Sequence, residues 1–228
     1  MTASDALDLL RAAGLPARWA GQERFVLLAM GGQADVLLAA LRQAWEGDAQ
    51  RCRRLQVVLL LTAAQPLAAG AGVSVPGLQR LPMPALADGS RLTVDLLQPP
   101  GLQAGNSHHQ VLREGLRALR LQADALLLAG PGWDDHLLRR LGSLAAPQAT
   151  LAAAVAATTT DLSKGLRAAG FVVEAASQTL LQARYAPRFV PRVQDVTGPA
   201  AQPGDEVLVL GAGLAGAACA QALARAGL

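Results

Sequence analysis

The clearest chemical pattern is a set of three glycines near the end of the chain, Gly211, Gly213 and Gly216, with the spacing G-x-G-x-x-G. The pattern follows the aliphatic segment 207–210 and opens the apolar segment 215–226. In a strand–turn–helix setting, the first glycine allows the tight turn, the second lets a pyrophosphate approach the backbone, and the third allows close packing. The helix N-terminus adds positive partial charge. The pattern therefore predicts a dinucleotide-binding turn rather than a structural glycine-rich turn.

The residues alone do not separate FAD from NAD. The acid that binds the ribose is expected about 20 residues after the turn, beyond the end of the chain.

The histidines and cysteines of the chain are not spaced as metal ligands. His108 and His109 lie in a segment rich in Gly, Asn and Ser, with no Cys or third His at ligand spacing. Cys52 and Cys219 are far apart, which fits a reducing compartment. We therefore interpret the histidines as a surface loop pair and expect no metal.

Asp134 and Asp135 follow Trp133 near the predicted carboxyl edge of a sheet, where ligands bind in doubly wound folds. They could contact a substrate, but helix capping by Asp134 is the favoured interpretation.

Alternating aliphatic runs and helical patterns must position these residues, and this alternation is typical of βαβ units in a mainly parallel sheet. Asp134 and Asp161 are expected N-caps and Gly170 a C-cap. The segments 70–84 and 99–105 are expected loops, because they are rich in Pro and Gly. The predicted strands are residues 24–30, 55–62, 92–97, 124–129, 149–156, 171–174, 179–185 and 206–210, and the predicted helices 34–45, 110–121, 134–141, 161–169 and 215–226.

The length of 228 residues, 52% of them hydrophobic, allows one complete domain and a remainder. We expect a first domain over residues 1–186, a linker rich in Pro and Gly over 187–204, and the truncated start of a second domain over 205–228. Asp5 and Asp8 stand where a signal peptide would carry positive charge, and no apolar run reaches about 18 residues. A soluble, cytoplasmic protein is expected.

Several segments together resemble the MnmC family, bifunctional proteins that complete 5-methylaminomethyl-2-thiouridine at the tRNA wobble position. The resemblance covers nearly the whole chain. The segments that carry it are Gly-Leu-Pro-Ala-Arg-Trp at 14–19, Arg-Cys-Arg-Arg-Leu at 51–55, Asp-Ala-Leu-Leu-Leu-Ala-Gly at 124–130, Gly-Leu-Arg-Ala-Ala-Gly-Phe at 165–171 and Gly-Ala-Gly-Leu-Ala-Gly-Ala-Ala-Cys-Ala at 211–220.

The resemblance implies a class I methyltransferase-like (Rossmann-like) domain with a mostly parallel seven-stranded sheet, its last strand antiparallel, that uses S-adenosylmethionine. It also implies that residues 205–228 open an FAD-binding Rossmann domain, with FAD at Gly211, Gly213 and Gly216. A tRNA-modifying enzyme of this kind removes a carboxymethyl group with FAD and then methylates the product. The partner implied is tRNA.

The turn that should hold S-adenosylmethionine departs from the family pattern. The family has E-x-G-F-G-T-G where this chain has Leu-Ala-Met-Gly-Gly-Gln-Ala at 28–34. Leu28 replaces the acid, Met30 the first glycine and Ala34 the last, so that only Gly32 remains.

Other groups of that cofactor site are also replaced. No carboxylate occurs in the segment 61–65, where an acid should hold the ribose, and Ala129 stands where relatives have the acid before Gly130. The later G-F-G-x-K-R-E-M segment is replaced at 175–182. Because each lost charged hydrogen bond costs on the order of 1.5–3 kcal/mol, we expect no methyl transfer here. The alternative function is a non-catalytic scaffold or tRNA-binding module that supports the oxidoreductase.

Arg51, Arg53 and Arg54 could contact tRNA phosphates, and a solvated helix end is an equally good interpretation. The formal net charge of +3 is compatible with an RNA partner without demanding one.

Overall fold

The chain divides into two units, Met1–Phe189 and Val190–Leu228, in a computed structural model. The structure describes residues 2–31, 33–62, 77–81, 83–99, 107–130, 133–154, 159–177, 179–187, 209 and 213–225. The predicted linker, apart from Pro187, and the predicted strand at 206–210, apart from Val209, lie outside these residues.

Eight strands of the described residues form one mostly parallel sheet in the first unit, in the order β3-β4-β2-β1-β5-β6-β8-β7. Neighbours from β4 through β6 are parallel, whereas β3, β8 and β7 pair antiparallel with their neighbours. The strands are β1 (Arg24–Met30), β2 (Arg54–Leu60), β3 (Gly77–Leu81), β4 (Arg91–Gln98), β5 (Ala123–Ala129), β6 (Ala145–Ala154), β7 (Phe171–Ala176) and β8 (Leu180–Tyr185).

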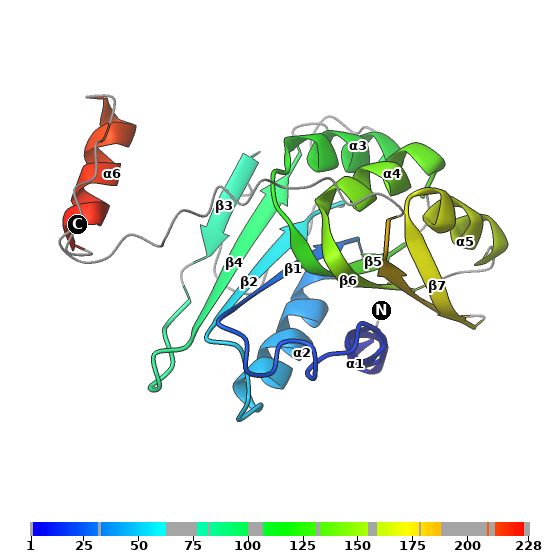
Figure 1. The fold of residues 1–228 in the computed structure, drawn as a ribbon, viewed down its shortest axis with the longest axis horizontal. Coiled ribbons are helices and arrows are strands. Elements are labelled where there is room, and N and C mark those ends of the chain that lie inside the picture. The colour runs from blue at the N-terminus through cyan, green and yellow to red at the C-terminus, as the bar shows by residue number, and fades with distance from the viewer. Residues whose placement is uncertain are drawn as a thin grey trace. The chain divides into compact units, whose positions relative to one another are not determined.

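Helices cover both faces of this sheet (Figure 1). Figure 1 shows α1 and α2 below the sheet and α3, α4 and α5 above it. Crossovers between parallel strands place helices on the two faces in this way. The helices of the first unit are α1 (Ala3–Ala12), α2 (Ala34–Glu46), α3 (His108–Ala118), α4 (Asp135–Leu144) and α5 (Thr159–Ala168), and α6 (Leu214–Arg225) belongs to the second.

The core is aliphatic and lies in two layers, one on each face of the sheet. In β1, Leu27 belongs to the layer shared with α1 and α2, while the next residue, Leu28, belongs to the layer shared with α3, α4 and α5. Six consecutive residues of β1 are buried as a result. This double burial explains why the strands read as continuous hydrophobic runs.

A row of polar side chains crosses the sheet from β1 to β3. Arg24 donates to the Gln56 side chain at 2.8 Å, and the Gln56 amide donates to Asp95 at 2.9 Å. Arg80 of β3 completes the row with hydrogen bonds of 2.7 and 3.1 Å to the same carboxylate. Asp95 is almost fully buried, so these donors compensate for its lost hydration.

All seven strands predicted between residues 24 and 185 are confirmed, with small changes at their ends. β3 is an addition, since it lies inside the expected loop 70–84. It is a short edge strand in which Leu78 is exposed, and its stability comes from pairing with β4 and from the Arg80–Asp95 ion pair. Local composition does not contain that information.

The helix predictions need three corrections. α1 was not expected, although Thr2 and Asp5 form a capping box at its start. His108 and His109 are the first residues of α3 rather than loop residues, because Ser107 caps the helix. α5 begins at Thr159, so Asp161 lies in its first turn and is not the N-cap.

Two predicted caps are confirmed. The Asp134 carboxylate accepts a hydrogen bond of 2.7 Å from the Leu137 amide at the start of α4. Gly170 follows α5 with a φ of +94°, the left-handed conformation typical of a helix end.

Candidate functional site

The parallel strands β1, β2, β4, β5 and β6 all end at the same edge of the sheet. The strand order reverses between β1 and β5, because β1 continues to β2 on one side and β5 to β6 on the other. Ligands of doubly wound folds bind at the carboxyl edge beside this switch point. The turns after β1 and β5 are therefore the place to test for a cofactor site.

At the turn after β1, side chains and backbone of the protein occupy the space around the described residues. Leu28 and Met30 are buried among aliphatic side chains above the sheet, and Gly32 lies outside the described residues. Gly31 has a φ of +74°, and a Cβ atom there would lie 1.9 Å from the carbonyl oxygen of Ala129. The backbone of the β1 turn thus lies directly against the end of β5, a constraint that sequence reasoning missed although Gly31 was visible beside Gly32.

The start of α2 also lacks the groups that S-adenosylmethionine needs. Gln33 occupies the N-cap without a side-chain hydrogen bond, and Asp35 adds negative charge in the first turn. At the end of β2, the described residues Leu61 and Thr62 carry no carboxylate for a ribose. A carboxylate at position 28 would be buried among aliphatic side chains, at a large cost in solvation. The described residues do not fit this cofactor.

Polar side chains gather instead at the end of β5 and the starts of α3 and α4. His109 Nε2 lies 2.7 Å from a carboxylate oxygen of Asp134, and the Trp133 indole donates to the Gly130 carbonyl at 2.9 Å. Partial burial opposes ionisation of Asp134, but the Leu137 amide and His109 outweigh it and lower the pKa of this carboxyl. Sequence reasoning treated the histidines and the aspartates separately, and the structure brings His109 and Asp134 together.

His108 completes this group. A Cβ atom at Gly130 would lie 4.0 Å from the His108 ring, and within the described residues His108 Nε2 is buried without a hydrogen-bond partner. The imidazole therefore has a free donor or acceptor next to the position where the family's acid is replaced by Ala129. In the described part of the chain, no three His, Cys, Asp or Glu side chains are placed to hold a metal ion.

The arginines around β2 lie at the opposite edge of the sheet, where this strand begins. Arg51 is used by the fold, since it donates to the carbonyls of Glu46 and Asp48 and stacks 5.6 Å from the centre of the Trp45 ring. Arg53 and Arg54 are exposed and lie 3.9 and 3.7 Å from the Glu23 carboxylate. Arg51 is therefore neither a free basic residue nor part of a solvated helix end, whereas Arg53 and Arg54 are solvated and paired locally with Glu23.

In the second unit, α6 begins directly after Gly213, and the Ala217 amide donates to the Gly213 carbonyl at 2.9 Å. Gly211 lies outside the described residues, and Gly216 lies in the first turn of α6. Gly213 is exposed, its φ is not left-handed, and a Cβ atom there would meet nothing within 4 Å. Nothing in the described structure of the chain requires glycine at this position, so the open space suits the approach of a ligand.

None of the helices that the structure describes is long and apolar enough to span a membrane. No protein-family model matches the chain.

Relatives with similar sequences share one name. The chain is 37% identical over 238 residues to the tRNA 5-methylaminomethyl-2-thiouridine biosynthesis bifunctional protein MnmC of Methylibium petroleiphilum, and 34% identical over 246 residues to that of Azoarcus sp.. These alignments cover 93% and 94% of the chain but 35% of each relative. The chain thus spans about a third of the length of the relatives it matches.

A solved structure supports the fold. The crystal structure of MnmC2 from Aquifex aeolicus matches 80% of this chain and 61% of its own, with a TM-score of 0.50 and 16% identity. At this identity the likeness bears on the fold alone, which is that of class I methyltransferases.

Proposed function

We propose, from the confirmed resemblance to the MnmC proteins, that this chain is the methyltransferase-like part and the start of the flavin-binding part of a bifunctional tRNA wobble-uridine modification protein. The observation that carries the proposal is the alignment of 93% of the chain with a protein of that name. The methyltransferase-like fold of residues 1–186 and the helix α6, which begins directly after Gly213, agree with it.

In this proposal the first domain no longer methylates. Leu28 is fully buried in an aliphatic layer, and Gly31 holds the β1 turn against β5. The domain serves the oxidoreductase as a scaffold or as a surface that holds tRNA.

Calorimetry with S-adenosylmethionine tests this loss, and no measurable binding is expected. Binding in the micromolar range would show that the cofactor site is rebuilt from other groups. It would contradict the proposal that this domain no longer methylates. A methyltransferase that binds S-adenosylmethionine, measured alongside, serves as the positive control.

The proposed chemistry is the removal of a carboxymethyl group by the flavin-binding part. FAD, when bound, would supply the two-electron oxidation. The turn formed by Gly211, Gly213 and Gly216 would place its pyrophosphate against Gly213 at the N-terminus of α6, where helix N–H groups face an anion. The open space at Gly213 supports this assignment.

The test uses the chain extended to the full length of its relatives. That protein should purify yellow with a flavin spectrum, and Gly213→Val should abolish the colour, because the new side chain would occupy the path of the pyrophosphate. Gln221→Val, on the exposed part of the same helix, is the matched control and should stay yellow. A folded but colourless extended protein, or one that keeps its flavin after Gly213→Val, would contradict the cofactor assignment.

A further inference from the structure

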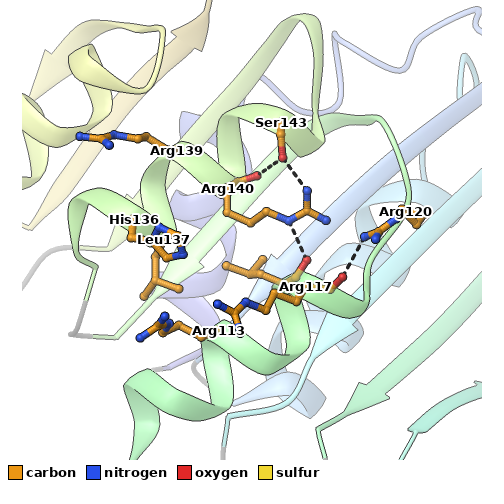
Figure 2. A pocket seen from close by; sticks show the side chains of 9 residues that line it. Arg113, Arg117, Arg120, His136, Leu137, Arg139, Arg140 and Ser143 are labelled. Atoms are coloured by element: carbon orange, nitrogen blue, oxygen red, sulfur yellow. Dashed lines mark hydrogen bonds between the residues drawn. The ribbon is translucent and has the colours of Figure 1, made fainter.

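A cavity of about 710 Å³ lies between α3 and α4, and its lining is strongly basic. No carboxylate is among the side chains that line it in the described structure. Five of its lining residues are arginines, namely Arg113, Arg117, Arg120, Arg139 and Arg140, and His136 also lines it (Figure 2).

Two of these arginines are used by the fold, and one of them, Arg140, links α4 to α3. Arg140 of α4 donates to the carbonyls of Leu116 at 3.0 Å and Leu119 at 2.9 Å. Arg120 donates to the carbonyls of Arg117 and Leu119 at 2.8 and 2.9 Å. Both guanidinium groups therefore cap the carbonyl end of α3, whose dipole favours positive charge. They fix one wall of the cavity and bring cationic charge to it.

The other three arginines are not used in this way. In the described part of the chain, Arg113, Arg117 and Arg139 make no hydrogen bond or ion pair through their side chains. Figure 2 shows Arg113 and Arg117 close together on α3, with Arg139 on α4 extending away from Arg140. Partial burial and then the charge of Arg120 lower the pKa of Arg140, so an anion in the cavity would relieve unfavourable charge.

The arrangement suits several phosphates along a strand. Arg113 and Arg117 are one helical turn apart, a rise of roughly 6 Å, and the cavity continues past them to Arg120 and Ser143. Guanidinium groups bind phosphate through paired N–H donors. A single phosphate would reach only part of the set, whereas a nucleic acid backbone carries a charge on every nucleotide. The hollow shape also fits a nucleic acid strand better than it fits a flat membrane surface.

We propose that the cavity between α3 and α4 binds the phosphate backbone of tRNA, with Arg113, Arg117 and Arg139 as the contacting residues. This inference rests on the proposed function for the identity of the RNA. Phosphate contacts position a nucleic acid without reading its bases, so the cavity holds tRNA while the nucleotide to be modified lies elsewhere.

The experiment measures binding of a fluorescent, unmodified tRNA to the 228-residue chain by anisotropy over a range of salt concentrations. The triple variant Arg113→Gln/Arg117→Gln/Arg139→Gln should weaken binding by about 10- to 100-fold and lower the slope of log Kd against log salt by roughly two to three. The variant should fold, because these side chains have no partners in the described structure. Circular dichroism checks this.

Two matched variants show whether charge at this place is responsible. Arg42→Gln/Arg53→Gln/Arg54→Gln removes the same charge from other exposed sites, including the alternative basic residues beside β2, and should change binding by less than about threefold, as expected for screened surface charges. Arg113→Lys/Arg117→Lys/Arg139→Lys keeps the charge but loses the paired N–H donors, so its affinity should lie between those of the Gln triple and the unmodified chain.

Three results would overturn the proposal: no binding of tRNA by the unmodified chain, equal losses in the two Gln triples, or arginine-dependent binding of vesicles containing phosphatidylglycerol without binding of tRNA. None of these results bears on the flavin colour of the extended protein, which tests the proposed function separately. Loss of that colour with intact tRNA binding would instead contradict the proposed flavin chemistry.

Discussion

Replacing Gly31 by alanine should destabilise the first unit strongly. The φ of +74° disfavours any side chain by about 1–2 kcal/mol. The new Cβ atom would also lie 1.9 Å from the Ala129 carbonyl oxygen, a rigid backbone atom at the end of a buried strand. Overpacking of this kind costs about 1–3 kcal/mol more, because β1 and β5 must separate. The total is a loss of about 2–5 kcal/mol in the free energy of unfolding.

Gly89→Ala is the matched control, since Gly89 has a φ of +80° and a Cβ atom there would meet nothing within 4 Å. Both variants share the left-handed backbone and the same change in the unfolded chain. Their difference therefore isolates the contact with Ala129, and Gly31→Ala should be the less stable by about 1–3 kcal/mol. Urea unfolding followed by circular dichroism measures both. Equal losses would refute the close approach of the β1 turn to β5.

Three further predictions concern single side chains. Burial opposes ionisation of Asp95, but Arg80 and Gln56 outweigh it and lower its pKa. Its stabilising effect is thus present above the unfolded pKa of about 3.9 and is lost as the pH falls through the lower folded pKa. Asp95→Asn should remove this acid dependence from urea titrations and cost about 1–3 kcal/mol at pH 7, whereas the exposed Asp8→Asn should cost less than about 0.5 kcal/mol. An unchanged acid limb in Asp95→Asn would contradict the role of the Arg80 pair. Asp134→Ala removes the cap of α4 and should lower the free energy of unfolding, measured by thermal unfolding, by about 1 kcal/mol. The neighbouring Asp135→Ala should lower it by less. Burial raises the pKa of the Cys52 thiol to about 11, whereas Cys219 is exposed, so a thiol reagent near neutral pH should modify Cys219 at once and Cys52 only after unfolding. Rapid modification of both thiols in the folded protein would show that Cys52 is accessible.

Local sequence was enough for the framework of the first unit. Strands covered by helices on both faces have to be hydrophobic at every position, so their positions could be predicted from aliphatic runs such as β1. Caps such as Asp134 and Gly170 are also local, because the groups they satisfy lie within a few residues. The resemblance to the MnmC proteins likewise came from short segments of the sequence, such as 124–130 and 165–171.

Contacts between distant segments decided the rest. β3 is held by pairing with β4 and by the Arg80–Asp95 ion pair, and neither interaction can be read from its own five residues. His109 reaches Asp134 across 25 residues, because the crossovers bring the starts of α3 and α4 to the same edge of the sheet. The arginines of the cavity are likewise spread over α3, the turn after it and α4, with β5 between the two helices, and only the packing of α3 against α4 makes them one basic surface. The sequence determined which residues are available, and the parallel topology decided which of them meet.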